Sequence, residues 1–235
     1  MFVHLNTHSI FSQMRGTASP RQLVRRAKEL NMGYLALTET NGIWGFIRFV
    51  QHARDADIRP IAGVNIVTGT DEMILLAENQ TGYENICRII SRVHDEPGAS
   101  VTSLVKSRKA GLFVLTHLEN TIQSLIKIFS DTQLFIELRP GVTEFRTLQL
   151  AKKYKLEMVA TGDVYFLNPE DQKTHKVLRA IENNLTLSQL SSENYKDQLH
   201  FFRSEKEMIT LFPNSMDAIN NTQYLADRCK QTGHI

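Results

Sequence analysis

Short apolar runs alternate with amphipathic stretches through the first two thirds of this 235-residue chain. Apolar runs of about four to eight residues have the length of buried strands, and longer amphipathic stretches are typical of helices. Seven runs are predicted as strands: Phe2–Leu5, Tyr34–Thr38, Pro60–Val67, Met73–Ala77, Leu112–Thr116, Leu134–Leu138 and Glu157–Thr161. Strands that are separated by helices pair mainly in parallel. The sequence therefore predicts an α/β fold, and seven repeats favour a barrel over an open sheet.

The stretch SPRQLVRRAKELN gives the clearest helix signal. Ser19 is a good N-cap, Pro20 suits the first helical position, and Gly33 follows as a stop. The stretches TEFRTLQLAKKYKL and YENICRIISRVH have the same amphipathic pattern. These stretches supply crossover helices for a barrel, in which active sites lie at the carboxyl ends of the strands.

From about Asn168 onward, the strand pattern gives way to helical patterns. Ser204 followed by Glu207 is a capping-box signature, and the polar stretch NNLTLSQLSSENYKDQ is predicted to be a loop. We therefore divide the chain into a barrel core over residues 1–167 and a helical segment over 168–235. The end of the chain has no natural stopping feature, so we expect it to be one piece of a longer protein.

The bulk composition is that of an ordinary globular chain, with 42% apolar and 22% charged residues. A formal net charge of only +2 gives no strong overall field for nucleic acid. Cys87 and Cys229 are far apart and form no metal-binding spacing, which suits a reducing compartment. The sequence contains neither a membrane-length apolar run nor a signal-peptide pattern, so we expect a cytoplasmic protein without membrane partners.

Polar residues gather at the predicted strand ends. They are His8, Glu39, Thr40, Asn65, His117, Asp163 and Tyr165, and His94 closes a helix. In a barrel these side chains would converge on one face, and histidine with aspartate suits Zn²⁺, Mn²⁺ or iron. Clustered metals activate water and neutralise phosphate, as in a metal-dependent phosphoesterase. Each residue also has an ordinary interpretation, as a capping, core, turn or surface residue.

Several long segments together resemble the PHP (polymerase and histidinol phosphatase) domain at the N-terminus of bacterial DNA polymerase III alpha subunits, and the branch related to error-prone polymerases is the most similar. The resemblance covers nearly the whole chain. It rests on HLNTHSIFSQMRGTASPRQLVRRAKELNMGYLALTETNGIWG, IRPIAGVNI, GYENICRIISRVH, MVATGDVYFLNPEDQKTHKVLRAI and HFFRSEKEMITLF. It implies a distorted seven-stranded, TIM-like βα barrel. In active members it also implies a trinuclear metal centre with about nine ligands.

The resemblance places the nine ligand positions of the family on this chain. Four of them carry a good metal ligand: His8, His94, His117 and Asp163. Five do not: Asn6, Arg15, Thr40, Asn65 and Tyr165, and Glu39 stands where the family has an aspartate. Arg15 matters most, because a guanidinium stays charged at physiological pH and repels a divalent ion. We expect it to pair with Asp163 or Glu39.

These substitutions predict a degenerate metal site, in which hydrogen bonds and ion pairs replace the metals. The expected cofactor content is none, or at most one divalent ion (zinc or manganese) held by His8, His94 and Asp163. The resemblance then implies a non-catalytic structural and docking domain of a DNA polymerase. Its partners would be the rest of the alpha subunit, a proofreading exonuclease or another replisome subunit, and DNA through the full polymerase.

Two other classes of function remain open from the sequence. One is a working metal-dependent phosphoesterase, either a 3′–5′ exonuclease or an enzyme like histidinol phosphatase. The other is a small-molecule binding module in which His8, Arg15 and Asp163 line an anion site. Basic residues Arg21, Arg25, Arg26 and Lys28 share one predicted helix, for which a solvated face is the simpler interpretation.

Overall fold

The computed structural model describes residues 1–69 and 71–229. Its centre is a curled sheet whose six strands lie in sequence order. They are β1 (Tyr34–Thr40), β2 (Arg59–Thr68), β3 (Asp71–Ala77), β4 (Leu112–Thr116), β5 (Leu134–Leu138) and β6 (Met158–Ala160). β3 runs antiparallel to both of its neighbours, and the remaining pairs are parallel. The start of β3 therefore lies at the same end of the sheet as the carboxyl ends of the other strands.

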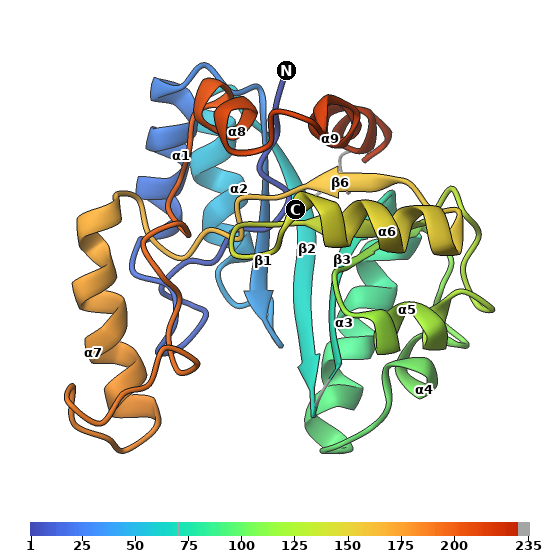
Figure 1. The fold of residues 1–235 in the computed structure, drawn as a ribbon, viewed down its shortest axis with the longest axis horizontal. Helices are drawn as coiled ribbons and strands as arrows, with labels where there is room; N and C mark the ends of the chain where they lie inside the picture. The colour runs from blue at the N-terminus through green and yellow to red at the C-terminus, as the bar shows by residue number, and fades with distance from the viewer. Residues whose placement is uncertain (70, 230–235) are drawn as a thin grey trace.

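Six of the seven predicted strands are confirmed, and the prediction of a seventh over Phe2–Leu5 is not. This segment is extended and runs beside β1 (Figure 1). It is hydrogen-bonded to β1 through the carbonyl of His4, which accepts from the N–H of Ala36 at 3.0 Å. On its other side the N–H of Val164 donates to the carbonyl of Asn6. The residues directly after it form only an isolated bridge, between Thr7 and Val164, and the N–H of Thr7 donates to the hydroxyl of Thr38 in β1 and not to a backbone carbonyl.

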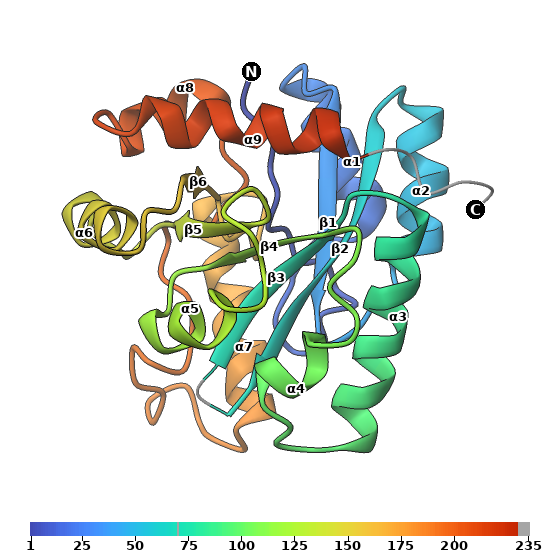
Figure 2. The same ribbon diagram turned by 90° about the vertical axis from the view of Figure 1, so that its right-hand side faces the viewer.

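Helices cover the outer face of the curled sheet (Figures 1 and 2). They are α1 (Pro20–Glu29), α2 (Phe46–Asp55), α3 (Gln80–Asp95), α4 (Val101–Val105), α5 (Glu119–Leu125) and α6 (Glu144–Tyr154). The predicted cap at Ser19 is confirmed, with Gln22 completing a capping box. α1 ends earlier than predicted, because the left-handed residue that follows it is Asn31 and not Gly33.

After residue 168 the structure continues with η1 (Pro169–Asp171), α7 (Gln172–Glu182), α8 (Glu205–Leu211) and α9 (Met216–Arg228). Ser204 and Glu207 form the predicted capping box of α8. The polar stretch between α7 and α8 is irregular, as predicted. Residues 230–235 of the predicted helical segment lie outside the described residues. None of the helices in the described ranges is long and apolar enough to cross a bilayer.

The inner face of the sheet encloses a small apolar core. Val3 and Leu5 of the N-terminal segment pack there with Phe113 of β4 and Phe135 of β5. Leu225 of α9 joins this core, and Figure 2 shows α9 lying across the end of the sheet where β1 and β6 begin. One end of the curled sheet is therefore filled by an apolar helix face, which leaves polar chemistry to the opposite end.

Candidate functional site

Five charged side chains meet at the carboxyl end of the curled sheet, opposite α9. We call them the charged cluster: Glu72, Glu137, Arg139, Asp163 and Lys196. Glu137 lies in β5, Arg139 directly after it and Asp163 just beyond β6, while Glu72 is near the start of the antiparallel β3. Glu137 and Asp163 are 1% and 0% exposed. Buried carboxylates require countercharge or hydrogen bonds, so their partners decide what this site can do.

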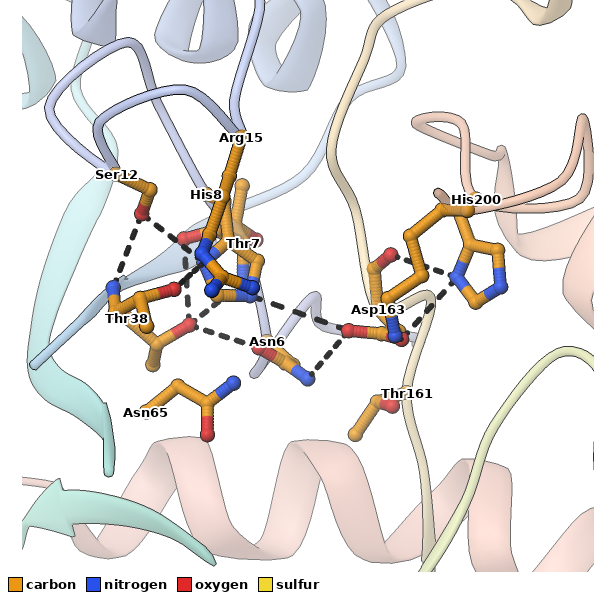
Figure 3. Close-up of polar contacts among 12 residues, drawn as sticks. Asn6, Thr7, His8, Ser12, Arg15, Thr38, Asn65, Thr161, Asp163 and His200 are labelled. Atoms are coloured by element: carbon orange, nitrogen blue, oxygen red, sulfur yellow. Dashed lines mark hydrogen bonds and ion pairs between the residues drawn. The ribbon is translucent and has the colours of Figure 1, made fainter. Parts of the chain in front are cut away.

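Asp163 is surrounded by nitrogen atoms. Its Oδ2 lies 2.7 Å from Nζ of Lys196, 3.2 Å from Nδ1 of His200 and 3.5 Å from Nη1 of Arg139. Figure 3 shows the ring of His200 directed at both this carboxylate and the backbone carbonyl of Asp163. Burial acts to raise the pKa of Asp163, but the charges of Lys196 and Arg139 outweigh it and hold the pKa well below its ordinary value. Asp163 is therefore a buried carboxylate that stays ionised.

Glu137 is satisfied by two neutral donors and two nitrogen-bearing groups. Thr161 Oγ1 donates to its Oε1 at 2.6 Å and Asn6 Nδ2 donates at 3.1 Å. His117 Nδ1 lies 3.4 Å from Oε2, and Arg139 Nη1 lies 4.0 Å from it. Burial again acts to raise the pKa, but the contact with His117 and the charge of Arg139 lower it overall. Glu137 is thus a second ionised carboxylate in the same pocket.

Arg139 joins all three carboxylates of the charged cluster. Its Nη1 also lies 3.3 Å from Oε1 of Glu72, which accepts a further hydrogen bond from Asn65 Nδ2 at 3.1 Å. Burial acts to lower the pKa of Arg139, but Asp163, Glu72 and Glu137 raise it above its ordinary value. The guanidinium is therefore a fixed positive charge at the centre of the pocket.

Asn6 links two of the carboxylates through a neutral amide. Its Nδ2 lies 3.1 Å from Glu137 Oε1. The same nitrogen lies 3.1 Å from Asp163 Oδ1, and the Oδ1 of Asn6 accepts from Thr38 Oγ1 at 3.0 Å (Figure 3). The amide nitrogen thus acts as a hydrogen-bond donor where a metal ligand would present a lone pair. This orientation stabilises the two carboxylates and offers nothing to a cation.

His8 lies between the charged cluster and the loop that follows the N-terminal segment. Its Nδ1 is 3.1 Å from Ser12 Oγ, and the Ser12 hydroxyl donates to Glu39, so Nδ1 must carry the hydrogen. Nε2 then holds a lone pair 3.9 Å from Asp163 Oδ1, with no hydrogen-bond partner in the part of the chain that the structure describes. Burial lowers the pKa of His8 to about 3, so the ring is neutral.

Glu39 faces the loop and not the charged cluster. Its carboxylate accepts from the hydroxyls of Ser9 and Ser12 and from the N–H of Ser9 at 3.2 Å. Burial raises the pKa of Glu39, and these neutral donors only reduce the rise. Glu39 therefore holds residues 9–12 in place through hydrogen bonds.

Three of the predicted pocket residues have contacts that explain their identity. Arg15 pairs with Glu182 at 3.5 Å, and not with Asp163 or Glu39 as expected. Tyr165 is buried and stacks on His8 with the ring centres 4.2 Å apart. Thr40 Oγ1 lies 3.4 Å from Nδ1 of His8. The structure thus puts an aromatic ring and a hydroxyl around His8, and it directs Arg15 toward α7.

The four predicted ligands are only partly brought together. His8 and Asp163 face each other, and His117 lies against Glu137 and within 3.9 Å of Glu72. His94, at the end of α3, is exposed, and its Nε2 lies 2.8 Å from the carbonyl of Asn41. The contacts of His94 are therefore with the loop after β1 and the Trp44 ring.

Sequence reasoning missed four members of the charged cluster and the histidine beside it: Glu72, Glu137, Arg139, Lys196 and His200. Arg139 directly follows a predicted strand and Glu137 lies within it, so a search for charges at strand ends would have found both. Glu72 directly precedes a predicted strand, so finding it required knowing that β3 runs antiparallel. Nothing in the sequence pattern points to Lys196, which lies in an irregular stretch.

The residues present do not fit the multinuclear metal centre that the family resemblance implies. Three carboxylates are present, but two fixed cations lie within 2.7–4.0 Å of them. A divalent ion bound at this position would repel both cations. Within residues 1–69 and 71–229, no three His, Cys, Asp or Glu side chains are arranged to hold a metal ion.

Comparisons with known proteins relate the chain to polymerase subunits. It is 29% identical over 264 residues to the DNA polymerase III subunit alpha of Pasteurella multocida, and 30% over 266 residues to that of Buchnera aphidicola from Schizaphis graminum. The subunit from Escherichia coli K12 is 29% identical over 267 residues. These alignments cover 97–98% of this chain but only 23% of each relative.

Solved structures support the fold. A candidate metal-dependent phosphoesterase from Bifidobacterium adolescentis matches 68% of this chain and 86% of its own, with a TM-score of 0.50 and 14% identity. An amidohydrolase from Chromobacterium violaceum matches 70% of this chain and 88% of its own, with a TM-score of 0.52 and 15% identity. At such low identity these matches concern the α/β architecture alone.

The family model of the PHP domain matches residues 4–133, which are more than half of the chain. The match spans the N-terminal segment with Asn6 and His8 and the strands β1 to β4. The chain therefore belongs to the PHP domain family.

Proposed function

We propose that this chain is the PHP region of a DNA polymerase III alpha subunit and that it acts as a structural and docking domain without phosphoesterase chemistry. The alignment of 97–98% of the chain with alpha subunits supports the first part. Nucleotide addition would then belong to other parts of a longer, cytoplasmic protein. In this proposal residues 1–167 form the barrel core, and 168–235 lead toward the polymerase palm.

One observation carries the proposed loss of chemistry. Asp163, which matches an aspartate ligand of active members, is bonded to Lys196 at 2.7 Å and lies 3.5 Å from Arg139. An activated water requires an open metal position beside such a carboxylate. Here the carboxylate is fully buried and its Oδ2 is directed at protein nitrogens, so the site stabilises the barrel instead of polarising a substrate.

The proposed partners follow from the polymerase relatives. The remainder of the alpha subunit is the first, and a proofreading exonuclease or another replisome subunit is the second. DNA would be contacted through the complete polymerase. Binding of the purified chain to the remaining regions of the same subunit, measured by calorimetry, tests the first of these contacts.

Metal content tests the proposed loss of chemistry. The purified chain, grown with zinc and manganese and without a chelating tag, is analysed by inductively coupled plasma mass spectrometry. We expect below about 0.1 equivalent of each transition metal. We also expect no metal-dependent release of nucleotides from primer ends and no hydrolysis of an aryl phosphate. About two to three equivalents of metal together with hydrolysis would overturn the proposal in favour of a phosphoesterase.

One observation favours a second candidate, a PHP domain that retains a single divalent ion. Nε2 of His8 has no hydrogen-bond partner in the described ranges and faces Asp163 Oδ1 at 3.9 Å. One ion held by these two residues would occupy this gap; His94, the third expected ligand, is exposed and bonded elsewhere. One equivalent of zinc or manganese that disappears in His8→Ala would establish this candidate, with a stabilising role for the ion.

A further inference from the structure

Lys196 belongs to a segment that is hydrogen-bonded to the rest of the fold, at the carboxyl end of the curled sheet, at several points. We call residues 172–202, which contain α7 and the following irregular stretch, the clasp segment. At the C-terminal end of this segment, the carbonyl of His200 accepts from the N–H of Tyr165 at 3.0 Å. The N–H of Phe202 donates to the carbonyl of Phe166 at 2.9 Å. The segment therefore returns to the strand end that carries Asp163.

The backbone of Lys196 is held by two side chains of α7. Its N–H donates to Nε2 of His175 at 3.0 Å, and its carbonyl accepts from Gln172 at 3.0 Å. Nδ1 of His175 in turn donates to the carbonyl of Arg15 at 2.7 Å. His175 is buried, and burial lowers its pKa to about 4, so a neutral ring can donate and accept at once. Lys196 is thus positioned by α7 and the N-terminal loop.

The charge balance of the pocket depends on this placement. The three carboxylates of the charged cluster carry three negative charges, and Arg139 supplies one positive charge from the end of β5. Lys196 supplies the second and makes the shortest contact of Asp163 with a cationic group, at 2.7 Å. Removing one partner of a buried pair leaves an uncompensated charge, which is strongly destabilising.

A metal ion and a lysine neutralise buried carboxylates in different ways. An ion neutralises the carboxylates without belonging to any segment of the chain. Lys196 lies 33 residues after Asp163 in the sequence, so its charge is present only while the clasp segment is docked. Two further residues of the clasp segment also hold it at this pocket. His200 Nδ1 lies 3.2 Å from the same oxygen of Asp163, and the N–H of Phe202 donates to the carbonyl of Phe166.

We propose that Lys196 takes the place of a metal ion in this PHP pocket and that it fastens the clasp segment to the barrel through Asp163. The inference rests on the proposed absence of metal chemistry and adds a consequence to it. In this chain the former metal pocket is an intramolecular docking point. Burial of Asp163 and docking of residues 172–202 are then one coupled event.

Hydrogen exchange of the 235-residue chain, measured by mass spectrometry, tests the clasp. In Lys196→Met, which keeps the length of the side chain and removes its charge, peptides from residues 183–202 should exchange at least about tenfold faster than in the wild type. Peptides from β1 and β2 should be unchanged. The matched control is Lys173→Met, an exposed lysine of α7, which should leave the exchange of residues 183–202 unaltered.

Equal exchange in Lys196→Met and the wild type would overturn the clasp. If Lys196→Met does not fold, the double variant Asp163→Asn, Lys196→Met removes both charges. Recovery of a folded barrel in it supports the coupling, and failure to fold overturns it. The metal content of the same wild-type sample separates the two proposals. Bound metal contradicts the proposed function, whereas a metal-free protein with unaltered exchange contradicts the clasp alone.

Discussion

Asp163 and Glu39 are both buried carboxylates at the carboxyl end of the sheet, but their surroundings differ. Asp163 is held by Lys196 and Arg139, and its pKa is well below the ordinary value despite burial. Glu39 accepts from two hydroxyls and a backbone N–H, and burial raises its pKa. The comparison shows that the neutral donors around Glu39 do not outweigh the effect of burial on its pKa, whereas the cations beside Asp163 do.

The largest expected effect is on the Asp163 side of this comparison. Arg139→Met removes the cation that contacts three carboxylates, and we expect the free energy of unfolding to fall by about 3–5 kcal/mol. Urea unfolding measures this loss. Arg21→Met, on the exposed face of α1, is the matched control and should change stability by less than about 0.5 kcal/mol. A loss of similar size in both variants would show that Arg139 has no special role.

Around Glu39 we expect a smaller loss in the free energy of unfolding. Ser12→Ala removes a hydroxyl that donates to Glu39 at 2.5 Å and accepts from the N–H of Thr40 at 3.0 Å. Unsatisfied buried groups of this kind cost about 1–3 kcal/mol. Urea unfolding should show this loss, whereas the exposed Ser188→Ala should not. A loss as large as that of Arg139→Met would contradict the distinction between neutral and charged partners.

The pH dependence of stability should differ in sign between the two carboxylates. Because the pKa of Glu39 is raised on folding, its contribution to stability is present when it is protonated and is lost as the pH rises from its ordinary 4.5 through the folded pKa. Asp163 has a lowered pKa, so its contribution is present above its ordinary 3.8 and is lost as the pH falls through the folded pKa.

Glu39→Gln isolates the first of these contributions. Relative to the wild type, this variant should be more stable at about pH 8 than at about pH 5. The reason is that only the wild type has a carboxyl group at this position, which loses its stabilising protonated form as the pH rises. Denaturant melts at the two pH values measure this difference. The opposite order would mean that Glu39 is stabilised in its ionised form.

The smallest effect on stability is expected at His94, which contacts neither Asp163 nor Glu39. Its side chain is exposed and contacts the carbonyl of Asn41 and the ring of Trp44, so His94→Ala should change stability by less than about 0.5 kcal/mol. Thermal unfolding with and without zinc should give the same small difference. A zinc-dependent stabilisation lost in this variant would return His94 to the candidate ligands.

The sequence by itself determined the features that depend on local chemistry. Apolar runs of strand length predicted β1 to β6, because burying them requires a sheet with helices on its face. Ser19 and Ser204 predicted helix starts, because an N-cap hydroxyl satisfies backbone donors a few residues away.

Only the tertiary structure decided which charges meet. Arg15 was expected to be the cation of the pocket, but it pairs with Glu182, and Arg139 and Lys196 take that position. Glu72 reaches the cluster because β3 runs antiparallel, and Lys196 because the clasp segment returns to the end of β6. Electrostatic partners are selected by distance in space, which the spacing of residues along the chain does not specify.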